Sequence, residues 1–171
     1  MDLEQTSERA QTGLSRFVED LALCLAVHRD RSPAVVWPEG IDATVAGRGG
    51  ELSELPTSLG ALLGAEVTSS VLVLPVGGRS DADTTEGDLV LLPLKGSCGS
   101  RVTPSVPGQG STVPEHTLEL RLRVGEALYV PQSYAYTLNA VHIPCTLQIL
   151  TLRPAVWREL DVPRPVHPAT P

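Results

Sequence analysis

Apolar residues recur at helical spacing in two segments near the start of the chain. In residues 13–28 they form one stripe, which predicts an amphipathic helix packed against a sheet. Residues 50–65 carry leucines at similar spacing and predict a second, shorter helix that Pro56 breaks. Between these segments, residues 34–37 form a short β-branched run that ends at Pro38, which predicts a strand.

From residue 67 onward the pattern changes to short runs of β-branched and aliphatic residues. The predicted strands are 71–76, 88–94, 118–124, 127–130, 134–141 and 145–152. In the third strand, apolar residues alternate with Glu119, Arg121 and Arg123, as expected when one face lies on a core. The segments interpreted as loops are 77–87, 95–100 and 104–116. This pattern predicts a mainly β fold, a closed barrel or a two-sheet jelly roll, and either would enclose a pocket.

The length and composition favour a single folded domain. The chain has 171 residues, of which 42% are hydrophobic and 19% charged, and this excludes a disordered protein. Within the domain we expect a helical and extended segment at 1–66, a barrel core at 67–153 and a C-terminal arm at 154–171. The three cysteines are widely spaced and odd in number, which predicts neither a disulfide framework nor a zinc knuckle.

The charge of the chain narrows its partners. A formal net charge of −7 gives no basic surface that could bind a polyanion by releasing its counterions, so we expect neither nucleic acid nor membrane as a partner. The polar, acidic N-terminal residues lack the basic start and apolar core of a signal peptide, which predicts a cytoplasmic protein. Lys95 is the only lysine among 13 Lys and Arg residues, a bias typical of GC-rich bacterial genomes.

Two segments resemble the JmjC-like cupins, in particular the bacterial ribosomal-oxygenase type. The family pattern Gly-Asp-x-Leu-Tyr-x-Pro is similar to residues 125–131, and an earlier strand of the family is similar to residues 88–96. The matching residues are Gly125, Glu126, Leu128, Tyr129 and Pro131, with Asp88, Leu91, Leu92, Leu94 and Gly96. The likeness extends over much of residues 50–152. It implies a cupin-like double-stranded β-helix, or jelly roll, with one or two N-terminal helices.

In active members of that family, a His-x-Asp pair and a later His hold Fe(II), beside which 2-oxoglutarate and oxygen bind. The resemblance places Asp83, Thr85 and Tyr136 at these positions, which implies a degenerate member without the metal triad and without a cofactor. We interpret Asp83, Thr85, Tyr134, Tyr136 and Gln148 as a vestigial pocket. Tyr136 either stacks on a ligand or fills the space of the iron, its hydroxyl bonded by Asp83, Thr85 or Gln148.

These features predict a pseudoenzyme, a non-catalytic binding or scaffold subunit that serves as an accessory protein in a bacterial natural-product pathway modifying peptides. Its partner would be an enzyme, a precursor peptide or a second copy of the chain in a homodimer. Trp157 and Leu160, which follow the last predicted strand, are the candidate partner surface. Trp37 is interpreted as a core anchor or a plug against the barrel exterior.

Three alternative functions stay open. A divergent metal-dependent cupin could use His142 with Asp81 or Asp83 to bind iron or zinc. A metal-free isomerase or cyclase could use Tyr136 as its acid and base. A small-ligand sensor could bind its ligand in the tyrosine-lined cavity.

Overall fold

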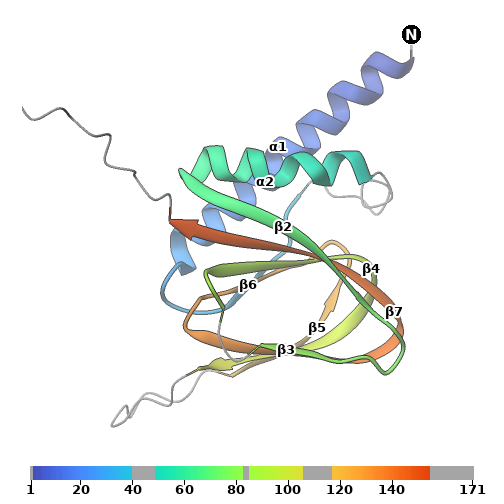
Figure 1. The fold of residues 1–171 in the computed structure, drawn as a ribbon. Coiled ribbons are helices and arrows are strands. Elements are labelled where there is room, and N and C mark those ends of the chain that lie inside the picture. Colours follow the sequence, from blue (N-terminus) through green and yellow to red (C-terminus); the bar gives the residue numbers. More distant parts are fainter. Residues whose placement is uncertain (1, 40–48, 83–84, 106–116, 155–171) are drawn as a thin grey trace, which may run out of the picture.

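The structure of the chain, a computed structural model, describes residues 2–39, 49–82, 85–105 and 117–154, with side chains except at 2–12 and 49–52. Its helices are α1 (Asp2–His28) and α2 (Gly49–Leu63). Its strands are β1 (Ala34–Val36), β2 (Ala65–Leu74), β3 (Ser80–Ala82), β4 (Asp88–Pro104), β5 (Leu118–Arg123), β6 (Ala127–Val130) and β7 (Tyr134–Pro154). Both helices lie on one side of a strongly curved sheet (Figure 1).

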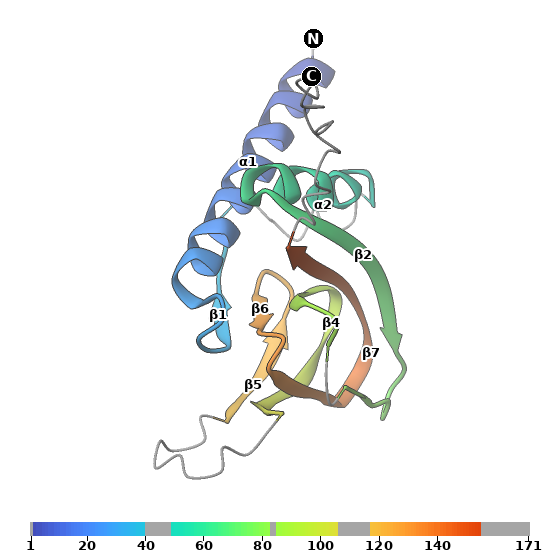
Figure 2. The same cartoon turned by 60° about the vertical axis from the view of Figure 1, so that its left-hand side comes forward.

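The described strands form one antiparallel sheet. Its order is β1-β6-β4-β7-β2, with β3 also paired to β7 and β5 also paired to β4. The two longest strands, β4 and β7, pair with each other, and each exchanges its other neighbour along its length. For β4 this neighbour changes from β6 to β5, and for β7 it changes from β3 to β2. The sheet bends over on itself and encloses an interior, as Figure 2 shows.

Alternate residues of the long strands face two separate apolar layers. On the outer face, Val90 and Leu92 of β4 cluster with Phe17 and Leu21 of α1 and with Leu59 of α2. The inner face supplies the buried cluster inside the roll: Leu74, Leu89, Leu91, Cys98, Val102, Leu122, Leu128, Val130, Tyr136, Leu138, Val141, Cys145 and Leu147. Burial of each large side chain contributes about 1.5–3 kcal/mol, so both layers stabilise the roll.

The predicted fold class is confirmed. The chain is mainly β, with an antiparallel cupin-like jelly roll and two N-terminal helices. The strands predicted at 118–124 and 127–130 are β5 and β6. The first helix begins at Asp2 and not at residue 13, because the Glu, Gln, Arg and Ala residues there favour a helix without forming an apolar stripe. Among the described residues, no helix combines the length and apolar character needed to cross a membrane.

Two predicted interruptions early in the chain are wrong. Pro56 lies inside α2, where Leu55 and Leu59 are both fully buried and hold the helix against the sheet. Residues 77–87, predicted as a loop, contain β3, which is short and has too few apolar residues to give a strand pattern.

Two further predicted interruptions fall inside the long strands. Residues 95–100 belong to β4, in which Gly96 has a φ of 73° and three register shifts against β7 bend the strand. Residues 134–141 and 145–152 belong to one strand, β7, although Pro144 lies between them. Glycine and proline mark bends here, and the strands continue through them.

Candidate functional site

The structure does not bring the predicted vestigial pocket together at one site. Tyr136 lies in the interior cluster with 8% of its surface exposed. Gln148 is on the same strand but shares its face with Leu150 and Leu152, which pack against the helices. The alternation of β7 shifts between these positions, at a bend where Ala140 has a φ of 48°. Tyr136 and Gln148 therefore point to opposite sides of the sheet.

The other predicted pocket residues are engaged locally. Thr85 Oγ1 donates a hydrogen bond to the Gly87 carbonyl oxygen at 2.6 Å. Gln148 Nε2 donates to Ser69 Oγ of β2 at 2.9 Å. The Tyr134 hydroxyl lies 3.5 Å from the carbonyl oxygen of residue 31, and its ring packs against the interior cluster. Three predicted residues lie outside the described part of the chain: Asp83, Trp157 and Leu160.

Among the described residues, the hydroxyl of Tyr136 bonds a side chain other than the predicted Thr85 and Gln148. It hydrogen-bonds the Ser80 side chain on β3, the strand in which Ala82 lies directly opposite Tyr136. Burial raises the pKa of Tyr136 above its usual value, although the bond to Ser80 acts in the opposite direction. The hydroxyl stays protonated at neutral pH, so it is poorly suited to remove a proton from a substrate.

Two thiols also lie inside the roll. Cys98 and Cys145 are fully buried, and their side chains hydrogen-bond each other. Burial raises the pKa of Cys98 to about 12 and also raises the pKa of Cys145. Since the thiolate is the reactive form, neither sulfur is a nucleophile at neutral pH. His142, the predicted ligand of an unusual metal site, is exposed, and no three described His, Cys, Asp or Glu residues form a group that could hold a metal ion.

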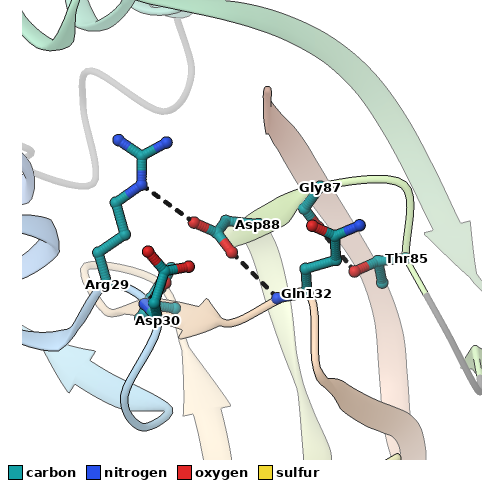
Figure 3. Close-up of polar contacts among 7 residues, drawn as sticks. Arg29, Asp30, Thr85, Gly87, Asp88 and Gln132 are labelled. Atoms are coloured by element: carbon teal, nitrogen blue, oxygen red, sulfur yellow. Dashed lines mark hydrogen bonds and ion pairs between the residues drawn. The ribbon is translucent and has the colours of Figure 1, made fainter. Parts of the chain in front are cut away.

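A polar cluster around the buried Asp88, here termed the Asp88 clamp, joins α1 to the sheet (Figure 3). Asp88 begins β4 and is 5% exposed. Its Oδ2 lies 3.4 Å from Arg29 Nε in an ion pair, and its Oδ1 accepts a hydrogen bond from the Gln132 backbone N–H at 3.0 Å. The Tyr129 hydroxyl also bonds the carboxylate. One side chain therefore fastens the end of α1 to the residues that follow β6.

The clamp also fixes the turn between α1 and β1. The Asp30 backbone N–H donates to the Tyr129 hydroxyl oxygen at 3.3 Å, and Asp30 has a φ of 58°, in the left-handed region that reverses the chain. Burial raises the pKa of Tyr129, and the negative charge of Asp88 raises it further. Deprotonation of this hydroxyl would place a second negative charge beside the carboxylate.

We expect alkaline pH to destabilise the fold through Tyr129 and Tyr136. Both pKa values are raised in the folded chain, whereas tyrosine in an unfolded chain ionises near pH 10. The free energy of unfolding should therefore be unaffected by these groups below about pH 9 and should fall as the pH rises above about 10. Urea unfolding at increasing pH, with ultraviolet absorbance of tyrosinate, measures this. A Tyr129→Phe/Tyr136→Phe chain with an equally steep alkaline loss would contradict it.

A groove opens between two free strand edges and is here termed the seam groove. Its volume is about 490 Å³. It is lined by His28, Pro33, Ala34, Val35, Trp37, Leu118, Leu120, Arg121 and Glu126. Among the described strands, β1 pairs only with β6 and β5 pairs only with β4, so each keeps one unpaired edge.

The seam groove has an apolar floor and a fixed aromatic residue at its rim. Val35, Leu118 and Leu120 pack against the interior cluster and form the floor. Trp37 is 68% exposed, and its Nε1 donates to Glu126 Oε1 at 3.2 Å. The second carboxylate oxygen of Glu126 accepts a hydrogen bond from a backbone N–H of β5 at 2.8 Å, which holds the pair in place. Trp37 is therefore a surface residue, and its interpretation as a core anchor is wrong.

Arg121 of β5 and the carboxylate of Glu126 both lie at the rim of the seam groove. Arg121 Nη2 donates to Ser97 Oγ at 2.8 Å. Within the described ranges, neither Arg121 nor Arg123 takes part in an ion pair. Across β5, Arg121 faces Gly99 and Arg123 faces Ser97, so β4 offers neither of them a carboxylate. Neither arginine therefore has an ion-pair partner among the described residues, although Glu119 lies on the same exposed face of β5.

Local sequence explains why this edge stays open. Pro38 follows β1 and has no backbone N–H to continue the pairing, and the Glu39 N–H donates to Asp20 of α1 at 2.8 Å. Gly125 has a φ of 91° and turns the chain between β5 and β6. Strand β1 pairs with β6, which follows this turn, and does not pair with β5. The only sequence signal for the groove is the Trp37-Pro38 pair at the end of a three-residue strand.

Comparisons with known proteins give a likeness in fold only. No family model matches the chain, and no curated protein matches its sequence. Among solved structures, vicilin from Capsicum annuum has a TM-score of 0.45 and 20% identity, covering 60% of this chain and 26% of that one. The CENP-C cupin domain of Drosophila melanogaster has a TM-score of 0.39 and 16% identity, covering 50% of this chain and 68% of that domain.

An enzyme is also among these structures. The DMSP lyase DddQ from Ruegeria pomeroyi has a TM-score of 0.40 and 13% identity, covering 53% of this chain and 40% of the lyase. The matches to this chain cover only 20% of an 11S globulin from Wrightia tinctoria and 27% of the vicilin from Solanum melongena.

Proposed function

We propose that the chain is a non-catalytic binding subunit, a degenerate JmjC-like cupin that contacts a partner protein or peptide through the seam groove. The observation that carries this proposal is the contrast between the inside and the outside of the roll. The interior is occupied by its own buried side chains, whereas an open apolar groove with an exposed, immobilised indole lies outside.

The interior favours contact over catalysis. In the active members of the family that the sequence resembles, this space holds the iron and its cosubstrate, but here Tyr136 packs inside the roll with Leu138 and Leu147. Burial raises the pKa of the ionisable groups described inside the roll, namely Tyr136 and the Cys98–Cys145 pair, and keeps them protonated. A substrate entering the roll would meet neither a base nor a nucleophile among these groups.

The seam groove has the features of a protein-binding hot spot. Tryptophan and arginine are the residues that most often dominate binding energy at interfaces, and Trp37 and Arg121 both line this groove. The bond from the Trp37 indole to Glu126 fixes the ring before a partner arrives, which lowers the entropic cost of binding. The apolar floor supplies area that a partner can cover.

A role as an accessory protein in a bacterial natural-product pathway fits this site. The seam groove would hold a precursor peptide or a loop of the modifying enzyme, and Trp157 and Leu160 of the C-terminal arm would extend the contact. The predicted cytoplasmic location suits such a partner.

The volume of the seam groove also supports a second candidate, a small-ligand sensor. Pockets for small molecules usually measure about 300–1,000 Å³ and combine an apolar lining with a few polar groups. The groove has that size and lining, with Arg121, Glu126 and His28 as its polar groups. A sensor of this kind would bind its ligand in the seam groove, whereas the sequence predicts the tyrosine-lined cavity.

We expect Trp37→Ala to weaken partner binding by about 30-fold, the loss typical of a hot-spot tryptophan. The immobilised full chain would capture partners from extracts of the source organism, and calorimetry would measure the dissociation constant of each purified partner. Val71→Ala is the matched control, because Val71 is similarly exposed, at 64%, but lies on β2 at the other edge of the sheet.

Equal affinity of every captured partner for the wild-type and Trp37→Ala chains would reject the seam groove as the site. A metabolite that raises the melting temperature of the wild type, but not of Trp37→Ala, would favour the sensor. Turnover of such a metabolite would reject a non-catalytic role.

A further inference from the structure

The free edge of β5 is built to accept another strand. Every second residue of an edge strand directs its backbone N–H and C=O away from the existing neighbour. The β5 edge opposite β4 has no described partner strand, and the seam groove runs beside it. At its end the backbone N–H and C=O of Arg123 already bond Glu126, so the open positions lie at Glu119 and Arg121. An extended segment lying here would satisfy these groups and close the roll between β5 and β1.

The side chains of β5 define what such a segment must carry. Leu120 and Leu122 face inward, with Leu122 fully buried, whereas Arg121 and Arg123 face outward and are exposed. Residues opposite each other on paired strands share a face, and opposite charges there attract. The complementary segment therefore alternates acidic and apolar residues, with the acidic ones opposite Arg121 and Arg123.

This pattern occurs in the chain itself, in the sequence Glu159-Leu160-Asp161-Val162. Laid antiparallel to β5, it sets Glu159 opposite Arg123, Leu160 opposite Leu122, Asp161 opposite Arg121 and Val162 opposite Leu120. Pro163 then follows, where a residue that cannot donate a backbone hydrogen bond ends the pairing. In the same register Trp157 lies opposite Gly125, next to Glu126, the residue that holds the Trp37 indole.

We propose that residues 159–162 of a second copy of the chain add to β5 as an antiparallel strand, giving a homodimer with reciprocally exchanged C-terminal arms. This inference rests on the proposed function, because it makes the arm the resident occupant of the seam groove. An external partner then binds by displacing it. Each copy is negatively charged overall but offers Arg121 and Arg123, which form no ion pair among the described residues, to the acidic arm of the other.

The position of the end of β7 favours a second copy over the same chain as the source of the arm. Along β4, Asp88 lies beside Leu152 near the end of β7, and Ser97 lies beside Arg123, the residue opposite Glu159, nine residues further on. Nine strand residues correspond to a path of about 30 Å along β4. The link from Pro154 to Glu159 spans at most about 17 Å. An arm from another molecule has no such restriction.

Charge reversal in the full-length chain tests the pairing. Sedimentation velocity across a range of concentrations should show a dimer for the wild type. Arg121→Glu/Arg123→Glu should weaken dimerisation by at least about 30-fold, as should Glu159→Arg/Asp161→Arg, because each places like charges opposite one another in both copies of the interface. Combining all four substitutions should restore the dissociation constant to within about threefold of the wild type.

The matched control is Arg16→Glu/Arg79→Glu, which makes the same change in net charge at two exposed positions away from the seam groove and should leave the dimer intact. Circular dichroism would verify that each variant is folded. A monomeric wild type, a dimer insensitive to the reversals, or a quadruple variant without recovery would each overturn the exchanged arm. If the chain is a monomer but captures a partner through Trp37, only the exchanged arm is rejected. If it is a dimer but captures no partner through Trp37, only the proposed function is rejected.

Discussion

Replacing Tyr136 by alanine should lower the free energy of unfolding by about 4 kcal/mol, the cost typical of truncating a buried aromatic side chain. Tyr136 is 8% exposed and belongs to the interior cluster, so its removal leaves a cavity inside the roll that neighbours refill only in part. Urea unfolding followed by circular dichroism would measure the loss. The same variant should gain the ability to bind benzene, seen as a rise in melting temperature absent in the wild type.

Tyr136→Phe is the matched control for that cavity. It keeps the ring and removes only the hydroxyl that bonds Ser80, so we expect a loss of about 1 kcal/mol and no benzene binding. A loss below about 1 kcal/mol for Tyr136→Ala would contradict the interpretation that this ring fills the interior. Such a result would reopen the roll as a binding cavity for a small ligand.

The fold was predictable where apolar periodicity is regular. Leucines alternate with charged residues in β5, and an apolar stripe marks residues 13–28 of α1, so both elements were identified. The continuity of β4 and β7 was not predicted, because Gly96 and Pro144 are typical turn residues and indicated that the strands end there. Only pairing with the adjacent strands keeps the chain extended through them, and such long-range pairing leaves no local signal.

The candidate site was less predictable than the fold. Side-chain direction along β7 depends on the bend at Ala140, which moves Gln148 to the opposite face from Tyr136. A period of two residues cannot reveal that shift. The seam groove joins residues about 80 positions apart, Val35 and Leu118, so it exists only once the sheet has rolled.

The Asp88 clamp and the seam groove are parts of one arrangement. The clamp fixes Arg29 and Asp30 in the turn after α1, and that turn leads directly to Pro33 and β1, which line the groove. The wall formed by β1 has only three paired residues of its own. The position of β1 therefore depends on how firmly α1 is fastened to β4. A substitution that breaks the clamp should weaken binding in the groove.

Asp88→Ala should accordingly destabilise the chain by about 3 kcal/mol, because removal of the carboxylate leaves the Gln132 N–H and the Tyr129 hydroxyl without their buried acceptor. Asp88→Asn keeps one acceptor oxygen and should cost about 1 kcal/mol. Chemical unfolding measures both. The matched control is Asp81→Ala, which breaks an exposed pair with Arg79 and should change stability by less than about 0.5 kcal/mol.

The effect of Asp88→Ala should extend from stability to binding. With the turn at Arg29 released, β1 loses its support, and the seam groove should bind its occupant less tightly even under conditions where the chain is fully folded. Sedimentation velocity would compare the dimer dissociation constants of the Asp88→Ala and Asp81→Ala chains. The Asp81→Ala control keeps the clamp, so a higher constant for Asp88→Ala would show the loss. Equal dissociation constants for the two variants would separate the clamp from the groove and leave Asp88 a purely stabilising residue.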